Sequence, residues 1–484
     1  MSEFHSIDSY RPRSSQYQLL PFRFTELDDK RFVATNLAGE FLVLPKEVVP
    51  QVIRHELPTN DPWYVELRAR HFLTDDSTSI ARDLLAIKLR TRYERLAEFT
   101  SLHIFVVTLR CEHSCQYCQV SRQSDNKREF DMSWDDAERA LDLALRSPSP
   151  AMKIEFQGGE PLLNGDLIRQ IVLEAERRRG PKQLEFVIAT NLALINSEFL
   201  AFCSAHDIHI STSLDGPRDL HNRNRPRPGH DSYERTIQGI KAVRTALGRN
   251  RVSALMTTTE ASLGRVKEII DEYLAQEFSG IFLRPISPYG FAIRTKSYLK
   301  YNTDRWVDFY KEGLEYIIDL NRQGLPFREF YASTILTKML TSRDPGYVDL
   351  TSPAGIGIGA VVYNYNGYVY ASDESRMLAE MGDEKFRLGH VQEHSYEDIF
   401  LSPKLLEPLQ DSFAYSSPMC HDCAFEPFCG SDPVLHWALY KDYVGRKPES
   451  EFCRRNMAIF RYLIGRMESD LFVRKLFLGW ANRC

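Results

Sequence analysis

The stretch from His103 to Cys118, HIFVVTLRCEHSCQYC, joins a β-type run to a loop that carries three cysteines. Residues 104–109 are almost entirely apolar, which is typical of a strand buried in a parallel sheet. A second stretch, Met152 to Leu163 (MKIEFQGGEPLL), again leads from a strand pattern into a polar, glycine-rich loop. Helical patterns lie between such strands, and one of them, Trp134 to Arg146, follows a capping Ser133. This alternation predicts βα units.

Six such units fit between residues 103 and 288. The predicted strands are His103–Leu109, Met152–Gln157, Leu184–Thr190, Ile208–Leu214, Arg251–Thr258 and Gly280–Ile286. Each is followed by a polar or glycine-rich segment, and parallel barrels assemble their active sites at the carboxyl ends of their strands. The fold class is therefore α/β, with a partial (β/α)6 TIM-like barrel and its chemistry at that rim.

The remaining sequence predicts three further parts. Residues 1–98 form a small α+β module, in which RFVATN and FLVLP make a hairpin that could bind a peptide by adding a strand. Residues 99–290 are the barrel, and residues 291–345 read as a helical linker. Residues 346–484 contain a hairpin with Asn366 and Gly367 at its turn, then a cysteine-rich segment and a terminal helix.

Composition excludes several classes of protein. The chain has 484 residues, of which 43% are hydrophobic and 26% charged, values of an ordinary globular protein. Its formal net charge of -5 is negative, so the protein as a whole does not attract the phosphate backbone of a nucleic acid. No apolar run reaches the roughly 18 residues of a membrane span, and the N-terminal residues lack a signal-peptide core. We therefore expect a cytoplasmic protein with neither nucleic acid nor membrane as a partner.

Seven of the nine cysteines fall into two groups. In a reducing cytoplasm such groups indicate metal binding rather than disulfides. The first, Cys111, Cys115 and Cys118, has CxxxCxxC spacing on one loop. Three thiolates can hold three irons of a [4Fe–4S] cluster and leave the fourth iron open to a ligand. The alternative is a zinc site completed by His113. Tyr117, within the motif, is a candidate aromatic contact.

The cysteine motif and FQGGEPLL together resemble the radical SAM superfamily. The resemblance implies that the open iron chelates S-adenosylmethionine (SAM) and that the Gly158-Gly159-Glu160 segment receives its amino group. Reduction then gives a 5′-deoxyadenosyl radical that abstracts a hydrogen from substrate. Two glycines allow close backbone approach to a ligand, and Glu160 offers an acceptor for an ammonium group.

Further candidate SAM contacts follow from the same resemblance: Gln157, Ser213 and Arg225. Asp215, in SLDGP, equally fits a residue that caps a turn or the next helix. Asn191 either contacts the ligand or satisfies loop backbone. The isolated Cys203 fits a small buried apolar residue, and Cys484 is a terminal thiol.

The second cysteine group, Cys420, Cys423, Cys429 and Cys453, is sufficient for a closed four-thiolate site, which by spacing alone could hold zinc. It resembles the SPASM extension of peptide-modifying radical SAM enzymes, which implies auxiliary iron–sulfur clusters. Ser352, Ser372 and Pro433 stand where that pattern has three more cysteines. In that pattern these three positions all serve one of two cluster sites, while the four cysteines that are present serve the other. We therefore predict one auxiliary [4Fe–4S] cluster. Asp373 matches a position where some relatives keep a catalytic carboxylate; a solvated turn residue is the alternative.

The N-terminal segments LLPFRFTELDD, TNLAGEFLVL and LRARHFL resemble radical SAM maturases of the His-Xaa-Ser system. This implies a ribosomally made peptide substrate, possibly with His-Xaa-Ser repeats, and an electron donor such as flavodoxin or ferredoxin. Modification of a folded sulfatase-like or dehydrogenase partner is the alternative activity. A non-catalytic iron–sulfur sensor or electron carrier is the alternative from another class.

Overall fold

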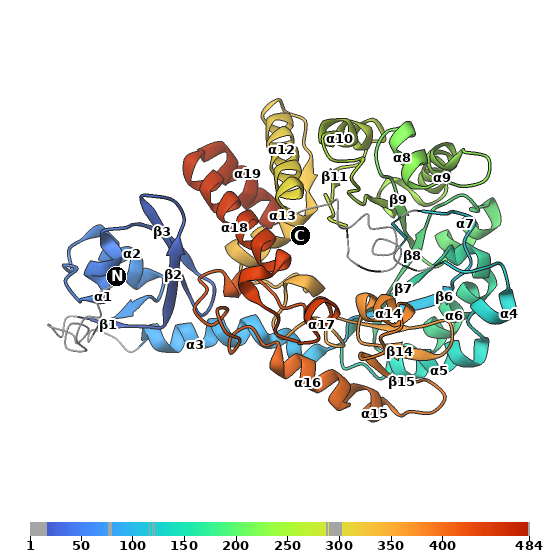
Figure 1. Ribbon diagram of the computed structural model, residues 1–484, viewed down its shortest axis with the longest axis horizontal. Helices are drawn as coiled ribbons and strands as arrows, with labels where there is room; N and C mark the ends of the chain where they lie inside the picture. Colours follow the sequence, from blue (N-terminus) through green and yellow to red (C-terminus); the bar gives the residue numbers. More distant parts are fainter. Residues whose placement is uncertain are drawn as a thin grey trace.

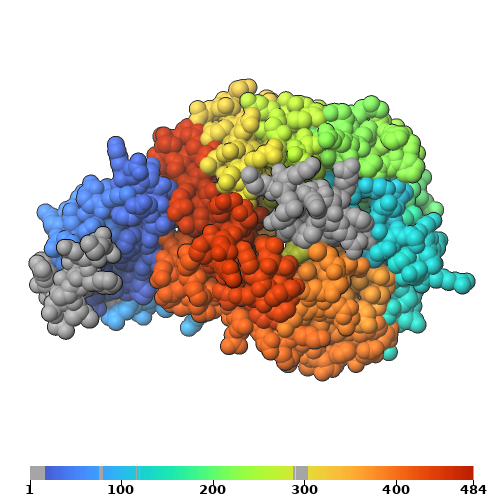
Figure 2. All heavy atoms as spheres, in the orientation of Figure 1, coloured from blue at the N-terminus to red at the C-terminus, as the bar shows by residue number. Residues whose placement is uncertain are grey.

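The protein is described here by a computed structural model, which covers residues 17–75, 80–115, 117, 118, 120, 122–286, 289 and 303–482. The start of the predicted N-terminal module, residues 291–302 of the predicted linker and Cys484 lie outside the described residues. An N-terminal module lies at one end of the molecule and the barrel at the other, with C-terminal segments between them (Figure 1). Figure 2 shows these C-terminal segments in contact with both neighbours.

The barrel sheet contains five of the six predicted strands, in sequence order and parallel: β6 (Leu102–Thr108), β7 (Ala151–Gly158), β8 (Gln183–Thr190), β9 (His209–Ser213) and β10 (Val252–Leu255). Helices cover its outer face: α5 (Trp134–Leu145), α6 (Gly165–Arg178), α7 (Ser197–Ala205), α8 (Arg218–Asn224), α9 (Ser232–Leu247) and α10 (Val266–Ala275). The Ser133 hydroxyl caps α5 as predicted, by accepting a hydrogen bond from Asp136 N. The α/β class and the parallel sheet are thus confirmed.

The sixth predicted strand differs. Only β11 (Gly280–Ile281) forms, and it pairs with β12 (Arg328–Glu329) rather than with β10. The chain bends just after β11, where Arg284 N donates to Phe282 O. Such a two-residue hydrogen bond turns the backbone and interrupts a ladder. Thr258 N still donates to Arg284 O, so this segment follows the end of the barrel without extending its sheet.

On its other edge the sheet is extended by the C-terminal part of the chain. Strand β13 (Ala360–Tyr363) pairs in parallel with β6, and β14 (Tyr368–Tyr370) and β15 (Arg387–His390) follow antiparallel. The predicted turn is confirmed, with Gly367 at φ +78°. The sheet therefore runs across two of the predicted parts, whose boundaries stay predictions.

The N-terminal module contains a three-stranded antiparallel sheet, β2 (Phe22–Glu26), β3 (Arg31–Asn36) and β4 (Phe41–Pro45), with β4 at one edge. The predicted hairpin is β3 and β4. The sheet packs on α1 (Val48–Ile53) and α2 (Pro62–Ala69) around a small core of its own. Two short strands, β1 (Gln18–Leu19) and β5 (Leu73–Thr74), pair beside it. Helix α3 (Ile80–Tyr93) then leads from the module to the barrel (Figure 1).

The rest of the described chain is mainly helical. Its helices are α12 (Thr303–Arg322), α13 (Phe330–Leu340), α14 (Asp373–Glu380), α15 (Tyr396–Phe400), α16 (Pro403–Asp411), α17 (Pro433–Tyr440), α18 (Glu451–Ser469) and α19 (Leu471–Ala481). No helix in the described ranges is both long and apolar enough to span a membrane. Helix α14 lies against one face of the sheet, where its Ala379 packs with Ile104, Val106 and Val362. This helix contributes to the functional site described below.

Candidate functional site

A cavity of about 350 Å³ lies at the carboxyl ends of the barrel strands. The predicted site residues that line it are Cys111, Cys115, Tyr117, Cys118, Gln157, Gly158, Gly159, Ser213, Arg225 and Asp373. The rim of a parallel sheet brings together the residues that follow each strand, because all the strands end there. Residues separated by more than 250 positions in sequence therefore share one cavity.

The cysteine loop follows β6 directly and is fixed by its own backbone. His113 N lies 3.4 Å from the Cys111 sulfur, and Cys118 N donates to Cys115 O at 3.1 Å. Ser114 N donates to Pro226 O at 2.7 Å, which ties the loop to the segment after α8. Burial raises the pKa of the Cys115 thiol to about 12. Such thiols become thiolates when a metal supplies compensating positive charge, so this donor set fits an iron–sulfur cluster.

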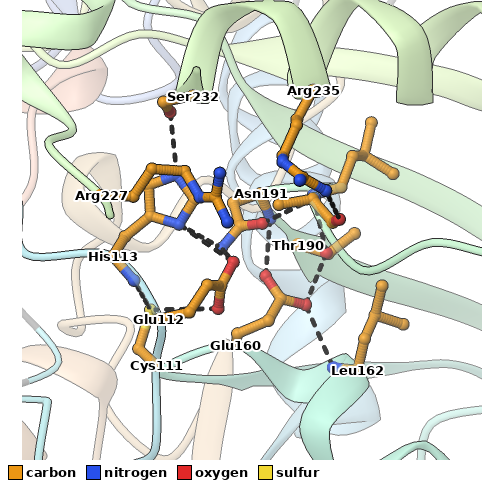
Figure 3. Close-up of polar contacts among 12 residues, drawn as sticks. Cys111, Glu112, His113, Glu160, Leu162, Thr190, Asn191, Arg227, Ser232 and Arg235 are labelled. Atoms are coloured by element: carbon orange, nitrogen blue, oxygen red, sulfur yellow. Dashed lines mark hydrogen bonds and ion pairs between the residues drawn. The ribbon is translucent and has the colours of Figure 1, made fainter. Parts of the chain in front are cut away.

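His113, the ligand of the alternative zinc site, has contacts at both ring nitrogens (Figure 3). Its Nδ1 lies 3.0 Å from a Glu112 carboxylate oxygen, and its Nε2 lies 2.8 Å from the Ser232 hydroxyl. Potential ligand atoms of Cys111, Glu112 and His113 do lie within 4.8 Å of one another. The imidazole, however, joins the loop to α9 and to Asn191, whose amide nitrogen is 3.0 Å from Nδ1. This arrangement favours an anchoring role for His113.

The two glycines at the end of β7 are required by the packing of that strand. A Cβ on Gly158 would lie 2.1 Å from Thr108 O, and one on Gly159 would lie 2.2 Å from Arg110 O. Gly158 also has a φ of +146°. Their missing side chains therefore let β7 approach the end of β6, where Gly159 N and Glu160 N donate to Thr108 O and Arg110 O at 2.8 Å. Both glycines also line the cavity, and their close approach to a ligand stays a prediction.

Glu160 is fully buried and does not line the cavity. One carboxylate oxygen accepts hydrogen bonds from the Thr190 hydroxyl (2.6 Å) and Leu162 N (3.1 Å), and the other accepts from Asn191 N at 2.9 Å (Figure 3). Burial, with Glu112 nearby, raises the pKa of this carboxyl group. Glu160 thus connects the loops after β7 and β8. Its expected contact with an ammonium group stays a prediction.

Asp215 organises the wall formed by the loop after β9. Its fully buried carboxylate accepts from the Tyr117 hydroxyl at 2.5 Å and from Arg225 Nε at 3.2 Å. The Arg225 guanidinium lies over the Tyr117 ring, 5.3 Å from its centre. Burial alone would lower the pKa of Arg225, but Asp215 raises it above its usual value. Asp215 therefore positions two predicted site residues. It does not cap helix α8, whose N-cap residue Pro217 has no side-chain cap.

A further group of charged residues in the cavity lining was largely missed by sequence reasoning. Asp373 and Glu374, at the start of α14, line the cavity together with Asp349 and Arg284. Asp373 pairs with Arg376 at 3.1 Å, and Arg376 also donates to Val120 O in the cysteine loop at 3.4 Å. Burial and the neighbouring carboxylates raise the pKa of Glu374. No local pattern marked Glu374 or Asp349, because they reach the cavity only through long-range folding.

The structure also shows the positions of Gln157, Ser213, Asn191 and Cys203. Gln157 donates to Glu155 at 2.6 Å beside the cavity, and Ser213 ends β9 on its rim. Asn191 satisfies loop groups, as its amide oxygen accepts from Ala193 N at 2.8 Å. Cys203 is completely buried in α7, as expected.

The C-terminal cysteines lie in the segment before α17 and in the first turn of α18. Burial raises the pKa of the Cys420 thiol to about 11 and that of Cys423 to about 12, and the thiols raise one another further. Helix α18 contributes neighbours as well, since the Asn456 amide lies 3.5 Å from the Cys429 sulfur. His421, between the first two cysteines, has a 61% exposed side chain. The four thiols form one mutually interacting group.

The three positions predicted to have lost cysteine each have a local structural setting. The Ser372 hydroxyl caps α14 in a reciprocal capping box. The Ser352 hydroxyl accepts from Ala414 N at 2.9 Å and borders a different cavity. Pro433 is the first residue of α17. Two of the three positions therefore have roles at helix starts.

Comparison with known proteins agrees with the site. Residues 105–272 match the radical SAM superfamily. The cysteine-type anaerobic sulfatase-maturating enzyme of Clostridium perfringens is 23% identical over 336 residues, which cover 66% of this chain and 84% of that protein. Among solved structures, native anSMEcpe with bound AdoMet superposes with a TM-score of 0.62 at 18% identity, over 79% of this chain and 99% of that one.

A second solved structure extends the match along the chain. Streptococcus suis SuiB bound to the precursor peptide SuiA superposes with a TM-score of 0.53 at 15% identity, covering 91% of this chain and 99% of that one. At these identities the structural matches establish the fold. Residues 105–272 are identified as a radical SAM domain, and the chain is similar over most of its length to a maturating enzyme.

Proposed function

We propose that this protein reductively cleaves SAM and uses the resulting radical to modify a ribosomally synthesised peptide. The observation that carries the proposal is the shared cavity. Cys111, Cys115 and Cys118 line it together with Asp373 and Glu374. A sensor or electron carrier would have no use for a cavity lined both by its cluster ligands and by carboxylates.

The roles of the chain's own residues follow from their contacts. The three cysteines would hold a [4Fe–4S] cluster, and when bound, that cluster with SAM supplies a 5′-deoxyadenosyl radical. Gly158, Gly159, Gln157 and Ser213 border the space that SAM would take. Arg225 presents a fixed positive charge there because Asp215 and the Tyr117 ring hold its guanidinium. Asp373 lines the same space and would accept a substrate proton, and its carboxylate is held by Arg376 at 3.1 Å.

The C-terminal cysteines would hold one auxiliary [4Fe–4S] cluster. Sulfurs bound to a single zinc ion at about 2.3 Å lie about 3.8 Å apart. Among Cys420, Cys423, Cys429 and Cys453, all of them described, no three sulfurs lie within 4.8 Å of one another. This wider spacing supports a cluster rather than a single zinc ion. Electrons would come from a donor such as flavodoxin or ferredoxin.

Two substrate classes are represented among the similar proteins. The SuiB structure holds a precursor peptide and has a counterpart for 91% of this chain, against 79% for anSMEcpe. The larger coverage favours a peptide, with His-Xaa-Ser repeats as the candidate target sequence. The sequence match to the sulfatase-maturating enzyme favours the alternative, modification of a folded partner protein.

The test is SAM cleavage by anaerobically reconstituted protein. With dithionite and SAM, the wild-type protein should form 5′-deoxyadenosine, because three cysteine ligands leave one iron open for SAM. A variant with Cys111, Cys115 and Cys118 all replaced by alanine should form none, yet keep the iron bound by the C-terminal cysteines. Cys203→Ala, at a buried thiol outside both groups, is the matched control and should remain active. Wild-type rates in the triple variant would refute the assignment.

A further inference from the structure

A second crevice, of about 270 Å³, lies between the N-terminal module and the end of α13. The module contributes the β3–β4 turn with Glu40, and Lys88 and Arg92 from α3. The opposite side is formed by residues 338–344, which end α13 and start the next loop. None of these residues belongs to the site described above.

The crevice carries an excess of positive charge. Its cationic residues are Lys88, Arg92, Lys338 and Arg343, and its carboxylates are Glu40 and Asp344. Both carboxylates are already engaged inside the protein. Glu40 accepts from Lys88 at 2.5 Å and from Asn36 at 3.0 Å, through different oxygens. Asp344 accepts from Gly346 N at 2.8 Å and pairs with Lys338 at 3.4 Å. An added anion would therefore find Glu40 and Asp344 already paired with Lys88 and Lys338, and Arg92 facing the same crevice.

Arg92 is the centre of that charge. Its guanidinium donates from Nη1 to Ala38 O at 3.1 Å, and within the described part of the chain no carboxylate oxygen lies within 4.0 Å of it. It rests against Gly39, where a Cβ would lie only 2.4 Å from Nη1. Gly39 has a φ of +85°, which also favours glycine. The guanidinium is thus held in place by backbone while its remaining nitrogens stay available.

The crevice joins a second, smaller cavity. This cavity, of about 80 Å³, shares Arg92, Lys338 and Asp344 with it and extends to Ser101 and Gly359. Leu102 and Ala360, the next residues along the chain, line the active-site cavity. Arg95, on the wall of this passage, donates to Asp344 O at 2.5 Å and rests on Gly346 as Arg92 rests on Gly39. The crevice and the smaller cavity are continuous through their three shared residues, and two joined cavities suit a chain-shaped ligand better than a compact one.

We propose that this crevice binds an acidic segment of the peptide substrate, with Arg92 as its main carboxylate contact. The inference rests on the proposed function and adds the chemistry of the recognised segment. A fixed guanidinium forms charge-assisted, often bidentate hydrogen bonds with carboxylates, and each such contact typically changes affinity by about tenfold or more. A compact acidic protein, such as an electron carrier, would dock on an open surface and is the competing outcome.

The experiment measures binding of a fluorescein-labelled hexaglutamate peptide to the holoenzyme by fluorescence anisotropy. We expect Arg92→Ala to weaken binding at least tenfold, and Arg92→Lys to weaken it less, because the charge remains. Arg90→Ala removes an exposed charge from the same helix outside the crevice and should change affinity less than twofold. A hexalysine peptide should not bind in the crevice.

Two results would overturn the proposal. One is binding of hexaglutamate that does not depend on Arg92, so that wild type and Arg92→Ala have equal affinity. Displacement of the peptide by flavodoxin from both proteins alike would be the same result. The other is affinity that stays constant between 50 and 500 mM KCl in the wild type, since paired charges must weaken with salt. This second measurement needs no variant to fold. Failure of the proposed function would appear separately, as absence of 5′-deoxyadenosine from the wild-type enzyme.

Discussion

Single buried charges do much of the positioning around the active-site cavity. Asp215 holds both Tyr117 and Arg225, and it has no exposed surface of its own. Removing one partner of a buried ion pair leaves the other charge uncompensated, and this typically costs about 3 kcal/mol or more. The geometry of the two predicted SAM contacts therefore depends on a residue that need not touch SAM.

Asp215→Asn should lower the free energy of unfolding by about 3 kcal/mol and weaken SAM binding. Asparagine keeps an oxygen for the Tyr117 hydroxyl but removes the charge that fixes Arg225. Chemical denaturation and isothermal titration with SAM measure the two effects. Asp219→Asn, which disturbs an exposed pair with Arg265, should cost less than about 1 kcal/mol. Equal losses in the two variants would contradict the role given to Asp215.

Sequence reasoning at this scale identified the residues that line the cavity better than those that support it. The cysteine spacing and the glycine pair have local signatures. The direction of the Glu160 carboxylate and the partners of Asp215 depend on residues 30 and 98 positions away, respectively Thr190 and Tyr117. Local patterns contain no information on such contacts, so Asp215 was equally compatible with a cap.

Among the elements, helix α14 connects the C-terminal part of the chain to the cysteine loop. Its start is fixed by the Ser372 capping box, and its Arg376 reaches Val120 O. Asp373 and Glu374 occupy the first turn, so their place in the cavity depends on where the helix begins. A serine in a position predicted to have lost a cysteine ligand has thus become a helix cap.

Ser372→Ala should reduce stability by about 1 kcal/mol, as expected for a lost N-cap. It should also impair peptide modification, because the first turn carrying Asp373 would fray. Ser395→Ala is the matched control: it removes the capping box of α15 and should cost similar stability. Thermal unfolding and product formation distinguish the two. If both variants modified peptide equally well, the start of α14 would not position Asp373 for catalysis.

The predicted strands show what periodicity can and cannot provide. Buried apolar runs located five barrel strands correctly, since their pattern is a property of each segment. The sixth failed because the bend at Phe282–Arg284 overrides a β-type composition. The parallel pairing of β13 with β6 was not foreseen, because a short hairpin pattern does not say which sheet its edge will join.

At the scale of the molecule, the chain has cysteines for two clusters. We expect about eight irons per chain, four from each [4Fe–4S] unit. A single added thiol does not complete a cluster site, so Ser372→Cys should leave the iron content unchanged while still disturbing α14. Iron and sulfide analysis with Mössbauer spectroscopy gives the count. Reproducible loading near twelve irons would mean that other ligands complete a third site.

The N-terminal module is attached by specific contacts as well as by α3. Arg23 pairs with Glu426 at 2.8 Å, and Phe41 packs against Phe428, next to Cys429. A chain beginning near Thr100 should keep basal SAM cleavage, lose affinity for the peptide and unfold at a lower temperature. Anisotropy with the acidic peptide and differential scanning calorimetry test this. Unchanged affinity in a folded truncated protein would exclude the module from peptide binding.

The pairing of β13 with β6 has a consequence for how the protein is made. Strand β6 leaves the ribosome roughly 250 residues before β13, which at typical synthesis rates is a delay of roughly 10 to 50 s. During that interval the barrel has an open edge and its cysteine loop lacks the cover of α14. An unpaired edge invites aggregation, yet the same opening gives an iron–sulfur assembly system direct access to the three thiols. Cluster delivery during translation would therefore take place before β13 and α14 complete the sheet and cover the cysteine loop.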